Sequence, residues 1–267
     1  MTRLSSVAVL LSAALLGACE KNAVQVISAP TTGGAFIRFQ NYAVGAPQVN
    51  FYANTQKLTG VTSSSCTPAP TIPNPACTAA GVEATTGVAY GASANAANYS
   101  MLSPGQYTFT SRIAAATDNG LSTSTAAATL ADGKFYTYFS SGIYSTATKS
   151  SDAFIVEDVL PTTFDYTKTY LRVVNASANA PTISATAKVQ GTTDVVSVAT
   201  SVSYKSASAF ATFAPGLTDV TITYGSGLTQ IFTGVNFLAG HVLTLALTGD
   251  ATVTGTSGLV LRAVYNR

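Results

Sequence analysis

Few residues of this sequence have the side chains that catalysis requires. A Ser-His-Asp triad would have to use His241, because the 267 residues contain a single histidine. His241 follows Ala239 and Gly240 at the expected start of a strand. An exposed polar residue is therefore the favoured interpretation of His241, and a hydrolase is the less favoured one. The same count excludes a metal site built from several histidines.

The acidic residues suggest no catalytic or metal site either. Asp152, Glu157 and Asp158 form the densest acidic group. Their oxygens could bind Ca²⁺, but their spacing matches no calcium loop, so a solvated strand and turn is favoured. The sequence also lacks a P-loop, a G-x-G-x-x-G and a G-x-S-x-G motif. We therefore expect no catalytic residue, no cofactor and no metal ligand.

Two arginines and several tyrosines could contact a ligand. Arg38 and Arg172 interrupt apolar strand-like segments, where they could bind anions or saccharides. The favoured interpretation is an outward strand position, or a partly buried guanidinium that donates to loop carbonyls. The tyrosines could stack on sugars, but core packing and cross-strand pairing are favoured. They are Tyr136, Tyr138, Tyr144, Tyr204 and Tyr224.

The composition limits the protein classes that remain. Only 9% of the residues are charged and the formal net charge is +2, whereas soluble domains carry about 25% charged residues. A coiled coil and a nucleic-acid-binding surface both need more charge, and the hydrophobic content of 47% argues against disorder. What remains is a β-rich protein without a nucleic-acid partner.

The elements that position these residues occur twice. Residues 37–47 and 171–181 align without a gap, and weaker matches follow in the same order. The four identical pairs are Arg38/Arg172, Asn41/Asn175, Ala46/Ala180 and Pro47/Pro181. Short runs of β-branched and aromatic residues alternate with turn residues in both copies. The sequence predicts two tandem immunoglobulin-like antiparallel β-sandwich domains, at residues 35–160 and 169–267, joined by a linker at 161–168.

Two residue types of the repeated motif have predicted structural roles. Asn41 and Asn175 end their strands, and we expect each side chain to cap its turn by bonding the backbone two residues on. Pro47 and Pro181 are expected to fix φ at the start of the following strand.

Cys66 and Cys77 flank a proline-rich segment in the first copy. Two cysteines left over in an exported chain favour a disulfide, which would close a surface insertion. Metal binding is the alternative, but the segment has no nearby histidine or carboxylate to complete a site.

The N-terminus has the features of an export signal. A basic start precedes the apolar residues 4–16, which are too few to span a bilayer. The following Leu-Gly-Ala-Cys, ending at Cys19, resembles the bacterial lipobox. The resemblance implies cleavage after residue 18, acylation of Cys19 and a tether over residues 19–34. Glu20 in the next position favours the outer membrane, and an ordinary signal peptide with an incidental Cys19 is the alternative.

The strand-entry motif itself resembles a known family. The pattern (I/L)-R-x-x-N-x-x-x-x-A-P, the Pro-Gly turn before Tyr107, and residues 131–137 are similar to the domain-of-unknown-function 4397 family. Glu157 and Asp158 match its acidic ending, which the second copy lacks. The resemblance implies secreted or surface β-domains, often in tandem, and transfers no catalytic residues.

These features together favour a non-enzymatic, lipid-anchored envelope protein that acts in surface display, adhesion or assembly. The expected partners are the membrane, through the lipid on Cys19, and an envelope protein or glycan. A carbohydrate-binding module of an envelope polysaccharide or uptake system is the alternative.

Overall fold

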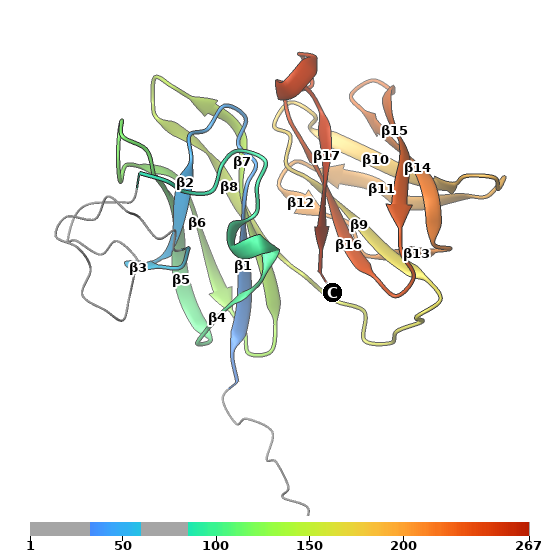
Figure 1. Cartoon of the computed structure of the whole chain (residues 1–267), viewed down its shortest axis with the longest axis horizontal. Helices are drawn as coiled ribbons and strands as arrows, with labels where there is room; N and C mark the ends of the chain where they lie inside the picture. Colours follow the sequence, from blue (N-terminus) through green and yellow to red (C-terminus); the bar gives the residue numbers. More distant parts are fainter. Residues whose placement is uncertain (1–32, 60–84, 267) are drawn as a thin grey trace, which may run out of the picture. The chain divides into compact units, whose positions relative to one another are not determined.

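The computed structural model describes residues 33–59 and 85–266 (Figure 1). The predicted signal peptide, Cys19, Cys66 and Cys77 lie outside the described residues. The described residues from Gly34 onward form one compact unit. Within the described residues the only helical segments are two short 3₁₀ turns, η2 (Ala94–Ala97) and η3 (Gly255–Ser257), and the rest of the regular structure is β. No helix found there could span a bilayer.

The strands up to Glu157 form two four-stranded sheets, which we call the first sheet pair. One sheet has the order β4-β1-β7-β8 and the other has the order β3-β2-β5-β6. Their bounds are β1 (Ala35–Asn41), β2 (Val49–Ala53), β3 (Gln56–Lys57), β4 (Ser100–Leu102), β5 (Gly105–Ile113), β6 (Ser122–Leu130), β7 (Phe135–Ser145) and β8 (Ser150–Glu157).

The remaining strands form the second sheet pair with the same plan. One sheet has the order β12-β9-β16-β17, with β13 also on β9, and the other has the order β11-β10-β14-β15. Their bounds are β9 (Thr169–Asn175), β10 (Thr182–Val189), β11 (Val195–Ser203), β12 (Ser206–Ala207), β13 (Ala211–Phe213), β14 (Gly216–Tyr224), β15 (Leu228–Phe237), β16 (Val242–Thr248) and β17 (Val260–Tyr265).

One pairing in each sheet pair departs from the prediction of purely antiparallel sheets. β1 pairs parallel to β7, and β9 pairs parallel to β16. After the first of the two parallel strands, the chain forms the strands of the opposite sheet before it returns to pair with the first strand. Parallel neighbours require such a crossover connection. The register is the same in both pairs, with Arg38 opposite Thr137 and Arg172 opposite Thr244.

Each sheet pair encloses its own apolar core. The first core centres on aromatic rings, with Phe39 contacting Phe51, Phe109 and Tyr138 at centroid distances of 5.0, 5.9 and 5.8 Å. The second core is mainly aliphatic, with one aromatic pair, Phe213 and Phe237, and alternate residues of β9 and β16 pack there against the inner face of the opposite sheet. Each strand buries every second residue between the two sheets. This arrangement explains the short β-branched and aromatic segments that recur along the sequence.

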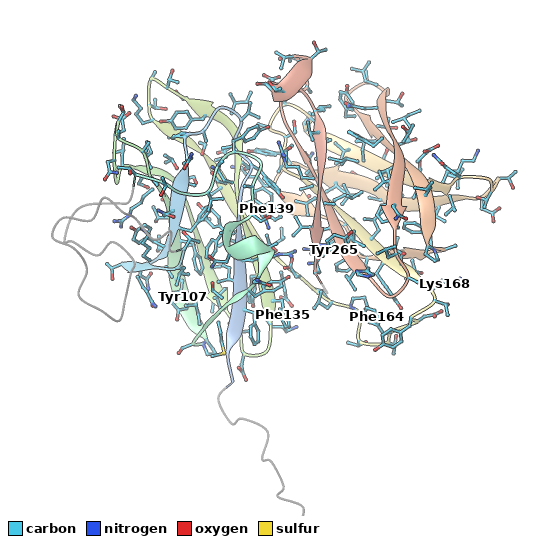
Figure 2. All side chains as sticks on the ribbon, viewed as in Figure 1. Tyr107, Phe135, Phe139, Phe164, Lys168 and Tyr265 are labelled. Atoms are coloured by element: carbon cyan, nitrogen blue, oxygen red, sulfur yellow. The ribbon has the colours of Figure 1, made fainter. Side chains whose placement is uncertain are left out.

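The opposite faces of β1, β7, β9 and β16 are buried as well. Every residue of β9 and of β16 is buried. A third apolar cluster takes Tyr42, Phe139 and Phe154 from the first sheet pair, and four residues from the second: Val174, Ala176, Ala246 and Val264. Phe139, which is labelled in Figure 2, stacks on Phe154 with 4.9 Å between ring centroids. Strands buried on both faces read as nearly continuous apolar runs, which is why so few charges occur in them.

The shared third cluster predicts that both sheet pairs unfold together. Replacing Phe39, which is 1% exposed, with alanine should cost about 3–5 kcal/mol of unfolding free energy. We expect a single cooperative urea transition whose midpoint shifts to lower urea in the variant. Circular dichroism and tyrosine fluorescence should report the same shift. Phe36→Ala is the matched control, with a smaller loss because this ring is only half-buried. Two transitions, only one of which moves, would contradict the prediction.

Candidate functional site

Arg38 and Arg172 occupy equivalent places in the two sheet pairs. Each lies in the middle of a buried strand, and only 1% of Arg38 and 2% of Arg172 is exposed. Nε of Arg38 donates to Oγ1 of Thr137 at 2.9 Å, and Nε of Arg172 donates to Oγ1 of Thr244 at the same distance. The repeated motif therefore holds one buried guanidinium in each sheet pair.

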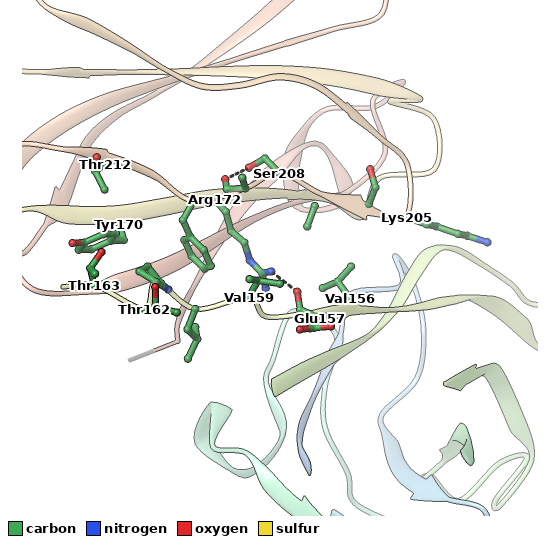
Figure 3. Close-up of a pocket in the computed structure, with 16 residues that line it drawn as sticks. Val156, Glu157, Val159, Thr162, Thr163, Tyr170, Arg172, Lys205, Ser208 and Thr212 are labelled. Carbon is green, nitrogen blue, oxygen red and sulfur yellow. Dashed lines mark hydrogen bonds between the residues drawn. The ribbon is translucent and has the colours of Figure 1, made fainter. Parts of the chain in front are cut away.

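Each guanidinium also binds the last strand of the other sheet pair. Nη1 of Arg38 donates to the carbonyl oxygen of Tyr265 in β17 at 2.7 Å. Reciprocally, Nη1 of Arg172 donates to the carbonyl oxygen of Glu157 in β8 at 3.0 Å (Figure 3). The guanidiniums do bind backbone carbonyls, as expected. Unlike the prediction, the guanidiniums are fully buried, and the carbonyls belong to the last residues of strands in the neighbouring sheet pair.

Asp158 is the carboxylate that both arginines share. Nη2 of Arg172 donates to Oδ1 of Asp158, and Nη2 of Arg38 lies 3.8 Å from Oδ2 in an ion pair. Oδ2 also accepts from Oγ1 of Thr137 and from the hydroxyl of Tyr99, both at 2.6 Å. A buried carboxylate requires this kind of full pairing, because desolvating it alone is costly.

The prediction of a solvated acidic group is therefore wrong for Asp158. Its side chain has no exposed surface, because the end of β8 meets the buried faces of β1 and β9. The carboxylates of the other two acidic residues pair with lysines instead of with the arginines. Glu157 pairs with Lys134 at 3.0 Å, and Asp152, which is exposed, pairs with Lys205 at 3.0 Å.

The second sheet pair has a neutral residue where the first has Asp158. Oγ1 of Thr244 donates to Oδ1 of Asn266 at 2.7 Å, just as Thr137 donates to Asp158. Because Asn266 carries no charge, two buried guanidiniums face one carboxylate. Nη2 of Arg38 has no hydrogen-bond partner in the described part of the chain. We call these four residues, Arg38, Arg172, Asp158 and Asn266, the arginine–aspartate cluster.

Aromatic rings complete both halves of the cluster. The guanidinium carbon of Arg38 lies 4.8 Å from the ring centre of Tyr99, and that of Arg172 lies 5.1 Å from the ring centre of Phe210. Tyr99 immediately precedes β4 and Phe210 immediately precedes β13, so the two rings are equivalent. Burial lowers the pKa of Arg38, against the opposing effects of Tyr99 and Asp158, and burial beside Asp158 raises the pKa of Tyr99.

A cavity of about 950 Å³ opens beside Arg172 (Figure 3). Its walls come from residues 156–163, which leave the first sheet pair, and from residues 205–212 of the second. Phe210 and Tyr170 contribute aromatic surface, and Thr162 and Thr212 contribute hydroxyl groups. The volume is at the upper end of the range usual for ligand pockets, about 300–1,000 Å³.

The motif asparagines differ in their hydrogen bonds. Oδ1 of Asn175 accepts from the backbone N–H of Ser177 at 3.1 Å, which is the predicted cap two residues on. Nδ2 of Asn41 donates to the carbonyls of Pro47 and Val88, at 3.2 and 2.9 Å, while its Oδ1 has no hydrogen-bond partner among the described residues. Nδ2 of Asn175 likewise donates to two backbone carbonyls. Both asparagines thus tie separate segments together, and they differ in that the predicted cap is present only at Asn175.

The motif prolines lie just before the second strand of each pair. One residue separates Pro47 from the start of β2, and Pro181 directly precedes β10. The carbonyl of Pro181 accepts from the N–H of Tyr204 at 2.8 Å. Both positions agree with a residue that directs the chain into the next strand.

The five tyrosines are divided between the two sheet pairs, and His241 packs against one aromatic ring. Tyr136 and Tyr138 belong to the first core, and Tyr224 packs against the second. Tyr204 donates to Asp152 at 2.9 Å, and Tyr144 is half-buried. The ring of His241 packs edge-on against Tyr265 with 5.4 Å between centroids. Across residues 33–59 and 85–266, no three His, Cys, Asp or Glu side chains gather in a way that could hold a metal ion.

The sequence indicated the arginines and their carbonyl partners, but not the side chains that bind them. Thr137 and Thr244 end the similar segments 131–137 and 238–244 and lie opposite the arginines, so the repeat carried a signal for them. Tyr99, Phe210 and Asn266 had no such signal, because their roles depend on how the two sheet pairs meet.

Removing the shared charge should destabilise the protein strongly. Asp158→Asn leaves two buried guanidiniums without a counterion, and we expect a loss of about 3–5 kcal/mol in urea unfolding at neutral pH. Asp152→Asn is the matched control, and it should cost less than about 1 kcal/mol because its pair with Lys205 is exposed. Equal losses from the two variants would contradict the assignment of Asp158 as the shared counterion.

Supplying the missing charge should have the opposite effect. Asn266→Asp places a second carboxylate beside Thr244, next to the strand end that Arg38 binds, and Nη2 of Arg38 makes no hydrogen bond in the described part of the chain. The variant loses the 3.3 Å bond from Asn266 to Tyr99, but the added charge pair should outweigh this loss. We therefore expect the free energy of unfolding to rise by about 1 kcal/mol. A lower urea midpoint for this variant would show that the cluster does not lack negative charge.

Comparison with known proteins places the chain in a family without an assigned biochemical role. The family model described as "Domain of unknown function (DUF4397)" matches residues 35–186, from the start of β1 into β10. No curated protein matches the chain.

Three solved structures are distantly similar, all from Bacteroides. A leucine-rich repeat protein from Bacteroides thetaiotaomicron VPI-5482 is 12% identical over 77% of this chain, with a TM-score of 0.18, and the match covers only 25% of that protein. A "putative cell adhesion protein" from Bacteroides ovatus ATCC 8483 is 12% identical, with coverage of 87% and 96% and a TM-score of 0.22. A second "putative cell adhesion protein", from Bacteroides fragilis NCTC 9343, is 10% identical, with coverage of 87% and 98% and a TM-score of 0.19.

The family match covers more than half of the chain and includes Arg38, Asp158 and Arg172. On that basis the chain belongs to the DUF4397 family.

Proposed function

We propose that this protein is a non-enzymatic, lipid-anchored module of the bacterial cell envelope, acting in surface display, adhesion or assembly. The arginine–aspartate cluster carries this proposal. The two arginines of the repeated motif and Asp158 are buried and bonded between the sheet pairs, where they join the two halves of the molecule. This use of the motif fits a stiff extracellular module better than a reaction centre.

The proposal includes two tandem copies of the family domain, each an immunoglobulin-like sandwich, at residues 35–160 and 169–267. The matched sheet orders, the equal parallel registers and the paired arginine contacts support the duplication. Residues 161–168 are the linker, and a Cys66–Cys77 disulfide closes the insertion in the first copy.

The anchor rests on the sequence of the N-terminus. Residues 1–18 are the lipoprotein signal peptide, Cys19 carries the lipid, residues 19–34 are the tether, and Glu20 directs the protein to the outer membrane. Several acyl chains on one cysteine give stable membrane attachment, which a single chain does not.

The cavity beside Arg172 supports a second candidate, a carbohydrate-binding module, because it combines aromatic surface with hydroxyl groups. A hydrolase that uses His241 is the least favoured reading.

The anchor predicts lipid labelling that depends on one residue. We expect the full-length protein, expressed in a Gram-negative host fed radiolabelled palmitate, to be labelled and to sediment with the outer membrane. Cys19→Ala should abolish the label and release the protein from the membrane fraction. Cys66→Ala is the matched control and should leave both unchanged. Label that persists without Cys19 would refute the anchor.

The adhesive role needs its own measurement. Cells that display the wild-type protein should attach to one another, or to an envelope-coated surface, several-fold better than cells that make Cys19→Ala. Equal attachment, with surface display of the wild type verified by protease accessibility, would refute the adhesive role while leaving the anchor intact.

A further inference from the structure

We propose that the cavity beside Arg172 binds the carboxylate of an acidic saccharide, such as a uronic acid residue of a glycan. The inference goes beyond an adhesive role and does not depend on the lipid anchor. It rests on the charge of the cluster behind the cavity wall and on the chemistry of the wall itself.

The cluster has one positive charge too many. Two guanidiniums, each at most 2% exposed, share the single carboxylate of Asp158, and the equivalent residue Asn266 is neutral. Charges in such a poorly solvated place act over longer distances than surface charges. An anion that enters from the side of Arg172 therefore meets an uncompensated positive field.

Arg172 is the member of the cluster that borders the cavity. It uses Nε for Thr244, Nη1 for Glu157 and Nη2 for Asp158. A guanidinium has five N–H groups, and these bonds account for three of them. Because only 2% of Arg172 is exposed, a carboxylate in the cavity would interact chiefly with the charge of the cluster, which the low local polarity strengthens.

The other charges at the cavity are already paired. Lys205 stands in the wall and binds Asp152 at 3.0 Å, while the carboxylate of Glu157 binds Lys134 at 3.0 Å. These two ion pairs are neutral overall. The excess charge that a ligand meets is thus the charge of the buried cluster.

The remaining wall fits a hydroxylated ring. Phe210 and Tyr170 provide aromatic surface, and Leu160 and Pro161 provide aliphatic surface. Thr162 and Thr212, both exposed, supply hydroxyl groups that can donate to and accept from sugar hydroxyls. Val159 is 65% exposed although it is apolar, as expected for a residue that a ligand covers. A sugar that carries a carboxylate satisfies both the charge and the wall.

The test is titration calorimetry of the purified protein with glucuronate, glucose and acetate at low salt. We expect glucuronate to bind at least ten-fold more tightly than either glucose or acetate. Equal binding of glucose would overturn the role of the carboxylate, and equal binding of acetate would overturn the role of the ring. No binding of glucuronate would overturn the whole proposal.

Asn266→Asp tests the charge without touching the cavity. Asn266 is not among the lining residues, and the variant neutralises the excess charge behind Arg172. We expect its affinity for glucuronate to fall about ten-fold, with circular dichroism unchanged. Asn236→Asp is the matched control, because it adds the same charge at an exposed position of β15. Equal affinities of the two variants for glucuronate would overturn the electrostatic basis of the site.

Discussion

The structure depends on one carboxylate, that of Asp158, which is shared by two buried guanidiniums. Oδ1 accepts from Arg172 of the second sheet pair, and Oδ2 lies beside Arg38 of the first. A buried guanidinium without a counterion is strongly unfavourable, so each sheet pair depends on the end of β8 for its arginine. The two arginines then bind the carbonyls at the strand ends of the opposite sheet pair, which makes the junction reciprocal.

This junction explains the composition as well as the arrangement. A strand in a free two-layer sandwich shows one face to water and alternates apolar and polar residues. β9 and β16 are buried on both faces because their second face belongs to the junction. Charged residues are excluded from both faces, except where one residue is paired as Arg172 is. Burial on both faces therefore accounts for the scarcity of charged residues within these central strands.

Much of the fold could be predicted from the sequence, because it depends on local patterns and on the repeat. Alternating residues such as those of β5 and β14 identify strands, and the gapless match around Arg38 and Arg172 identifies equivalent positions. The parallel pairing of β1 with β7 could not be predicted, since hydrophobic periodicity is the same for parallel and antiparallel neighbours.

The contacts of the junction were hidden for a different reason. Asp158 has the local sequence of a solvated turn, and it is buried only because a second sheet pair covers it. Asn41 and Asn175 show the same limit. Both have the sequence of a turn cap and both donate through Nδ2 to carbonyls of separate segments, yet only Asn175 accepts the N–H two residues on. Local sequence determines which bonds a side chain can make, and the packing of distant segments determines which it does make.

The two halves of the junction are similar, but they differ at two positions that change their chemistry. In the first half, Tyr99 donates to Asp158 and accepts from Asn266, so its hydroxyl joins the two strand ends. In the second half, Phe210 has no hydroxyl, and a cavity lies beside it. The missing charge lies on the other side of the cluster, because Arg38 binds the strand end that precedes the neutral Asn266, whereas Arg172 pairs directly with Asp158. The free space beside Phe210 and the net positive charge of the whole cluster are the two inequalities on which the proposed anion site rests.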